Sequence, residues 1–154
     1  MKKIYSFSLL LFVTVLLAGC SKDILKPYDD RIEGSWELTD VDRIGWGSSN
    51  IAFDGGRFTF YGSGRMNYED GYGGFYEGDW NIRSRNIPDC YTDENGVSQC
   101  DNRNVRTLQI HVIDFTTHDT RSEYFDEMVF TGTNRFKAYI YDGPRTYIFK
   151  FSRR

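Results

Sequence analysis

The stretch RFTFYGSGRMNY, residues 57–68, indicates the fold of this chain. Phe58 and Phe60 alternate with other residues, Met66 and Tyr68 do the same, and a Gly-Ser-Gly segment lies between the two runs. A period of two places alternate side chains on one face of a β-strand, and closely spaced glycines favour a tight turn. This stretch is therefore predicted to form a β-hairpin with one buried face.

The same alternation recurs along most of the chain after residue 31. Short connections rich in Gly, Asn and Asp separate the runs, as antiparallel hairpins require. Consecutive hairpins form a meander, and the predicted fold is all-β: an up-and-down antiparallel barrel of about eight strands, with a β-sandwich as the alternative. The further residues expected on buried faces are Trp36, Leu38, Tyr76, Gly78, Trp80, Ile82, Leu108, Ile110, Val112, Phe136, Ala138, Ile140, Tyr147, Phe149 and Phe151.

A long polar insertion, Ser84 to Asn104, interrupts this pattern and is expected to project from one end of the barrel as a loop. It contains Cys90 and Cys100, an even pair once Cys20 is set aside. In an oxidising compartment such a pair is predicted to form a disulfide, worth about 2 to 3 kcal/mol in the chain-entropy model. A redox-active pair is the alternative, but the Cys-x-x-Cys spacing typical of such sites is absent.

The N-terminal residues have the anatomy of an export signal. Lys2 and Lys3 precede an apolar run, residues 4–18, which is shorter than the roughly 20 residues that a membrane-spanning helix needs. Its end, Leu17-Ala18-Gly19-Cys20, resembles the lipobox of bacterial lipoproteins, with an ordinary secretory signal as the alternative.

The lipobox resemblance implies a cleaved signal peptide (1–19) and a lipidated tether (20–30), and the predicted barrel domain then occupies residues 31–154. It also implies a lipid on Cys20 that anchors the protein to a membrane. Ser21, in place of Asp, implies the outer membrane by the usual sorting rule. Whether the domain faces the periplasm or the cell surface is left open.

Composition narrows the functional classes. The expected mature chain is long enough for one domain with one core. Loss of the signal peptide removes two lysines and no acidic residue, which lowers the formal net charge from −3 to about −5. Because basic residues alternate with acidic ones, no nucleic-acid-binding surface is predicted.

Gly34-Ser35-Trp36 resembles the Gly-x-Trp signature that opens the first strand of lipocalins, and the whole domain is similar to small lipocalin-like lipoproteins of Gram-negative bacteria. The lipocalin Thr-Asp-Tyr motif is absent. The resemblance implies that Trp36 closes one end of the barrel beneath a stacked arginine, either Arg135 or Arg145.

The resemblance also implies a non-enzymatic protein that binds a small hydrophobic or amphipathic ligand inside the barrel. The side chains expected to line such a site are Trp36, Phe58, Phe60, Met66, Tyr68, Tyr76 and Trp80. The hydroxyls of Tyr61, Tyr68, Tyr72 and Tyr76 could contact a sugar or a lipid headgroup at the barrel mouth. The alternative is a solidly packed barrel that contacts a partner protein through its loops, especially residues 84–104.

Catalytic and metal sites are not predicted, and no cofactor is expected. His111 and His118 are too few for a usual metal site. Glu77 and Asp79 have the spacing of a glycosidase pair, but they alternate with apolar residues and are expected on the solvent face, so hydrolysis is the third hypothesis. The stretch 93–96 does not fit the register of a calcium loop and favours a plain turn.

Overall fold

The computed structural model describes residues 26–47 and 50–154. Strands account for 64% of the described residues and helix for 4%, which confirms the all-β class. The predicted signal peptide (1–19) and Cys20 lie outside the described residues. No helix in the described part of the chain is long and apolar enough to cross a membrane.

Within the described residues, one short helix precedes nine antiparallel strands. The helix α2 begins within the last residues of the predicted tether. The elements are α2 (Tyr28–Ile32), β1 (Gly34–Ile44), β2 (Arg57–Phe60), β3 (Arg65–Glu69), β4 (Phe75–Thr92), β5 (Ser98–Ile113), β6 (Thr120–Phe125), β7 (Glu127–Phe130), β8 (Arg135–Asp142) and β9 (Arg145–Arg153).

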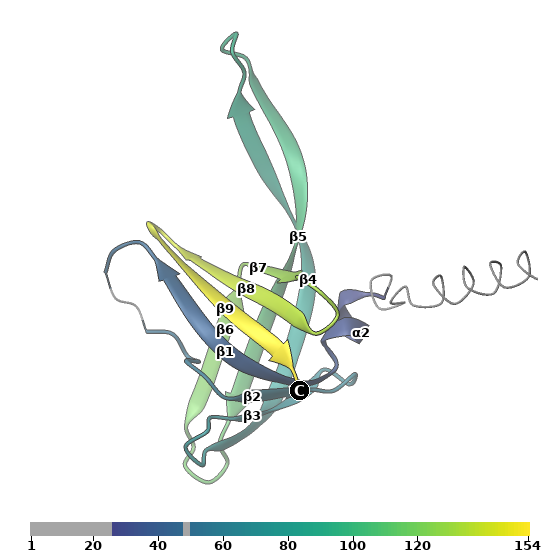
Figure 1. The fold of residues 1–154 in the computed structure, drawn as a ribbon, viewed down its shortest axis with the longest axis vertical. Coiled ribbons are helices and arrows are strands. Elements are labelled where there is room, and N and C mark those ends of the chain that lie inside the picture. Colours follow the sequence, from purple (N-terminus) through teal and green to yellow (C-terminus); the bar gives the residue numbers. More distant parts are fainter. Residues whose placement is uncertain (1–25, 48–49) are drawn as a thin grey trace, which may run out of the picture.

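The strands form a single curled sheet in the order β6-β5-β4-β3-β2-β1-β9-β8-β7 (Figure 1). Almost every strand pairs with its neighbour in sequence, as the predicted meander requires, and β1 also pairs with the last strand, β9. The opening stretch, residues 57–68, forms the β2–β3 hairpin in the predicted register, with Phe58 opposite Tyr68 and Phe60 opposite Met66.

The predicted closed barrel is wrong, because the nine-stranded sheet is not closed into a ring. Its two edges are β6 and β7, which are consecutive in sequence and meet at Asp126. The Asp126 amide donates to the Tyr139 carbonyl, and its carboxylate accepts a hydrogen bond from the Tyr141 amide. These two bonds draw the chain away from β5 and onto β8, so the hydrogen-bond ladder is interrupted there.

Large side chains fill the concave side of the sheet. Trp36 is fully buried, packs edge-on against Phe136 at 4.8 Å between ring centroids, and donates its indole N–H to the Ile32 carbonyl. The arginine stacked on Trp36 is Arg153, with its guanidinium carbon 4.6 Å from the ring centroid. The expectation of Arg135 or Arg145 is therefore wrong, since the last residues of β9 lie beside the start of β1.

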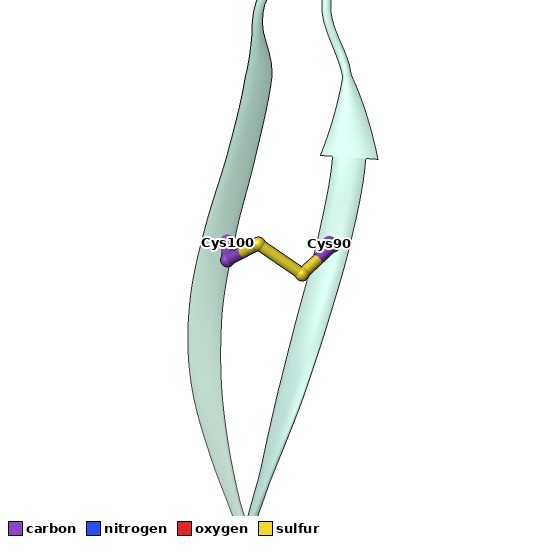
Figure 2. Close-up of a disulfide and its surroundings, with 2 residues drawn as sticks. All are labelled: Cys90 and Cys100. Carbon is purple, nitrogen blue, oxygen red and sulfur yellow. A yellow bond between two sulfur atoms is a disulfide. The ribbon is translucent and has the colours of Figure 1, made fainter.

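The insertion, residues 84–104, projects as predicted but is not a loop. It continues β4 and β5 as one antiparallel hairpin that rises away from the curled sheet (Figure 1), and we call these residues the arm. Cys90 lies directly opposite Cys100, and the predicted disulfide joins them across the two strands (Figure 2). Sequence alternation did not reveal these strands because neither face of the arm is apolar.

Removing the disulfide is expected to loosen the arm and leave the curled sheet intact. The arm contributes no residue to the buried core described above, and a lone two-stranded hairpin is marginal in water. In the variant with both cysteines changed to serine, amide exchange within 85–103 should accelerate roughly 30- to 150-fold, the equivalent of about 2 to 3 kcal/mol. Hydrogen exchange measures this, and a collapse of protection in β1 and β9 would contradict it.

Candidate functional site

The seven side chains predicted to line a ligand site lie together on the buried face of the first four strands. None is more than 7% exposed. Five of the rings contact one another: Phe58 with Tyr68 at 4.6 Å between centroids, Tyr68 with Tyr76 at 5.4 Å, and Phe60 with Trp80 at 5.7 Å. The Trp36 ring contacts Phe136 instead. The sequence therefore identified which residues share a face, and in the structure that face forms part of the core.

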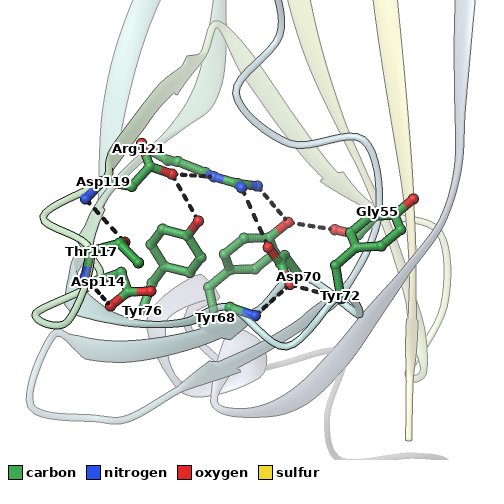
Figure 3. A network of polar contacts seen from close by, with 10 residues as sticks. Gly55, Tyr68, Asp70, Tyr72, Tyr76, Asp114, Thr117, Asp119 and Arg121 are labelled. Carbon is green, nitrogen blue, oxygen red and sulfur yellow. Dashed lines mark hydrogen bonds and ion pairs between the residues drawn. The ribbon is translucent and has the colours of Figure 1, made fainter.

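A polar network covers this aromatic cluster at one end of the sheet (Figure 3). At its centre is Arg121 of β6, which donates to the Asp119 and Asp70 carboxylates at 3.3 and 3.4 Å and to the Tyr68 hydroxyl at 3.4 Å. Its guanidinium carbon lies 4.7 Å from the centroid of the Tyr76 ring, within the range of a cation–π contact. Arg121 therefore contacts two carboxylates, the Tyr68 hydroxyl and the Tyr76 ring.

The two tyrosine hydroxyls of the network are used inside the protein. Tyr68 donates to the Gly55 carbonyl at 3.0 Å, and Tyr76 donates to the Asp119 carboxylate at 2.8 Å. Burial raises the pKa of Tyr68 to about 12, whereas the hydrogen bonds from Tyr76 and Arg121 hold the pKa of Asp119 below its usual range. These hydroxyls therefore stabilise this end of the sheet and are not directed toward solvent.

An open hollow of about 480 Å³ lies beside the network. Tyr72 is 89% exposed at its rim, and the side chain of Arg121 is 25% exposed. Ile51 and Ala52 supply an apolar wall. Of the tyrosines proposed as headgroup contacts, Tyr72 alone has its ring at this hollow, since the Tyr61 hydroxyl accepts a hydrogen bond from Asn67 elsewhere.

The arm is the second candidate site. Nearly all its side chains are exposed, including Tyr91 at its distal half. At its base Arg103 forms a bidentate ion pair with Glu127 of β7, at 3.0 and 3.1 Å, and Tyr141 donates to the same carboxylate. These contacts hold the base of the arm against the rest of the sheet, while the distal half extends into solvent.

The residues considered for chemistry are dispersed. Glu77 and Asp79 are exposed on the face of β4 opposite the core, and Asp79 has Arg65 and His111 as its cross-strand neighbours. Residues 93–96 form the turn of the arm, where the Asp93 carboxylate accepts backbone hydrogen bonds. Within residues 26–47 and 50–154, no group of three or more His, Cys, Asp or Glu side chains could hold a metal ion.

Sequence reasoning missed Arg121, Asp119 and Asp70. They come from separate turns and strands, so no motif joins them, and each has a common surface residue type. Their one sequence signal is indirect, because Tyr68 and Tyr76 lie on a buried face and their hydroxyls need polar partners.

Comparison of the chain with protein-family models, with curated proteins and with solved structures found no match.

Tyr68→Phe is expected to destabilise the protein by about 1 to 2 kcal/mol at pH 8, since the Gly55 carbonyl loses its donor. Because the pKa of Tyr68 is raised, its contribution to stability is complete below pH 10 and is lost as the pH rises toward 12. Chemical denaturation should therefore show a smaller loss of stability between pH 10 and 12 in the variant than in the wild type. Tyr72→Phe, at an exposed position, is the control, and equal pH profiles for Tyr68→Phe and wild type would refute the assignment.

Proposed function

We propose that this protein is a lipid-anchored, lipocalin-like protein of the bacterial cell envelope that acts without catalysis, as an interaction module that contacts a partner protein through its arm. The lipid anchor is proposed from the lipobox at Cys20, and the lipocalin likeness from Gly34-Ser35-Trp36 and from the meander. Outer-membrane attachment is proposed from Ser21.

The observation that carries the interaction proposal is the arm itself. Residues 84–104 extend two strands well beyond the sheet and supply no side chain to the core (Figure 1). Their disulfide stabilises a ribbon that has little packing of its own (Figure 2). An ordered, exposed ribbon that adds nothing to the core supports a role in contacting another molecule.

The packing of the seven predicted lining residues also favours the interaction module over the ligand-binding barrel. Trp36, Phe58 and Phe60 contact other aromatic rings within the core. A ligand among them would have to separate these rings. Glu77 and Asp79 are solvated on the outer face, which favours a non-catalytic role.

The second candidate function is binding of a small amphipathic molecule, and the hollow beside Arg121 favours it. Its apolar wall and the exposed Tyr72 ring suit a molecule with one flat apolar face. Native mass spectrometry of the full chain released from detergent tests this candidate. A retained small molecule whose occupancy falls in Tyr72→Ala would support it, whereas an unliganded mass in every preparation would contradict it.

Cys20→Ser is expected to release the protein from membranes, because the acyl chains would have no attachment site. Fractionation of cells that express the wild type and the variant measures this. Ser21→Ala keeps the cysteine and should remain with the membranes. Membrane retention of Cys20→Ser would contradict the lipid anchor.

Photo-crosslinking in intact cells tests the role of the arm. A photoreactive amino acid in place of Tyr91, in the distal arm, is expected to give discrete protein adducts at least several-fold above background, because this exposed position would lie against the partner. The matched control is the same amino acid in place of Glu77, also exposed on β4 but on the curled sheet. Adducts at neither position, or equal adducts at both, would contradict the proposal.

A further inference from the structure

The two edges of the arm can be assigned from the hydrogen-bond ladder. The β4–β5 register runs without a shift from Glu77 opposite Ile113 to Thr92 opposite Ser98. The Trp80 amide donates to the Gly64 carbonyl, and so points away from β5. Because backbone groups alternate in direction along an antiparallel strand, even-numbered residues of β4 and their partners in β5 direct their N–H and C=O groups outward.

The disulfide agrees with this assignment. The Cα atoms of Cys90 and Cys100 lie 4.0 Å apart, which is the close spacing of a pair that exchanges no backbone hydrogen bonds. Both cysteines are therefore at outward positions of the ladder.

The outer edges of β4 and β5 in the arm differ in the backbone donors and acceptors that are available to another strand. On β4 the outward positions include Pro88, which has no N–H, and proline is a usual means of blocking an edge strand. On β5 the outward positions Ser98, Cys100 and Asn102 each retain both a donor and an acceptor. The β5 edge of the arm is therefore the one suited to accept a further strand.

No described strand covers this β5 edge. The β6 strand pairs with β5 as far as Leu108, and the chain then bends at Asp126 toward β8. The Arg103–Glu127 ion pair joins the base of the arm to β7. The segment from Ser98 to Arg103 therefore presents an unpaired edge to solvent.

The charge of the distal arm indicates which kind of molecule could bind at the unpaired β5 edge. Residues 89–102 contain four acidic residues and no Lys or Arg. Asp89 lies directly opposite Asp101, an arrangement of like charges that is unfavourable across a ladder. Tyr91, half exposed, is two residues beyond Asp89 on the same face. Arg103, the next residue of β5 on this face, lies within electrostatic range of Asp89, but it is already paired with Glu127. A further cationic side chain beside Asp101 would relieve the remaining repulsion.

The same charges oppose two other occupants. A second copy of the chain, paired edge to edge, would bring another set of four acidic side chains against the first. A membrane surface rich in anionic lipids would repel the arm. Charge complementarity favours a basic polypeptide.

We propose that the outer edge of β5, from Ser98 to Arg103, accepts an extended basic segment of a partner protein as an added β-strand, with Lys or Arg side chains beside Asp101 and directed toward Asp89 on the next strand. Main-chain hydrogen bonds to the outward positions hold the segment, and the carboxylates select its charge. This inference rests on the proposed function of the arm and names the chemistry of its partner.

The probe is the acetylated and amidated heptapeptide Lys-Val-Lys-Val-Lys-Val-Lys, added to the full chain in a neutral detergent. The fluorescence anisotropy of the labelled peptide should rise when it binds, and its affinity should fall as salt is added. The same peptide with every backbone amide N-methylated keeps its charge but cannot form a ladder, and it should bind at least tenfold more weakly. Equal binding of the two peptides would overturn strand addition.

Amide exchange locates the peptide on the arm. The outward amides of Ser98, Cys100 and Asn102 should slow when the peptide binds, whereas those of Gln99 and Asp101 are already paired within the arm and should change little. Slowing confined to the β4 edge, or absent from both edges, would overturn the assignment.

Two pairs of variants separate the backbone and charge contributions. Asn102→Pro removes an outward N–H from the β5 edge and should weaken binding about tenfold, whereas Asn86→Pro removes one from the β4 edge and should not. Circular dichroism and disulfide titration report whether each arm stays folded.

The second pair leaves the backbone unchanged, so it tests the inference even if a proline variant unfolds. Asp89→Asn with Asp101→Asn should weaken binding about tenfold and reduce the salt dependence. Glu77→Gln with Asp79→Asn makes the same charge change on the curled sheet and should have little effect. Equal effects of the two pairs would overturn the role of the arm carboxylates.

The outcomes distinguish this inference from the function on which it rests. Crosslinks at Tyr91 in cells, together with no discrimination between the two peptides, would retain the arm as a contact surface and refute strand addition. Absence of those crosslinks would refute the proposed function itself. Arm-dependent dimers in sedimentation would identify a second copy as the occupant and overturn the basic partner.

Discussion

The bend at Asp126 determines the form of the curled sheet. One residue separates a strand that pairs with β5 from a strand that pairs with β8. Asp126 fixes this change of partner, because its amide donates to β8 and its carboxylate accepts a hydrogen bond from β8. Without it, β6 would continue along β5 toward the base of the arm. Because of it, the sheet remains open between β6 and β7, and the distal part of β5 has no described neighbour on its outer side.

The strands and their order were predictable because each is a local pattern followed by a local turn. Residues 57–68 contain both strands of a hairpin and the glycines of its turn, and their register follows directly. The bend at Asp126 has no such signature, since an acidic residue between two short strands is also what a solvated loop contains. The arm was mistaken for a loop for a related reason: alternation identifies a strand only when one of its faces is buried.

Contacts between distant segments were the least predictable part of the candidate site. Arg121 reaches Tyr68 and Asp70 from about fifty residues away, and nothing in its local sequence distinguishes it from other arginines. The arginine over Trp36 shows the same limit. A cation was expected there, but its identity depended on Arg153 pairing with Trp36 across β1 and β9, a register that the sequence alone does not specify.

The acidic residues of the arm suit an exposed strand edge, because such an edge must avoid pairing with unwanted chains. An unpaired edge in water is a template for any extended chain, including another copy of the same protein. Pro88 blocks one edge of the arm by removing a donor, whereas the β5 edge keeps all its donors and is flanked by carboxylates. The carboxylates leave the backbone N–H and C=O groups of the β5 edge available. They attract a strand of positive charge and repel a strand of negative charge. The β5 edge, protected by charge, therefore differs from the β4 edge, which proline blocks. Its carboxylates repel a second acidic copy of the chain but not the cationic strand that we propose.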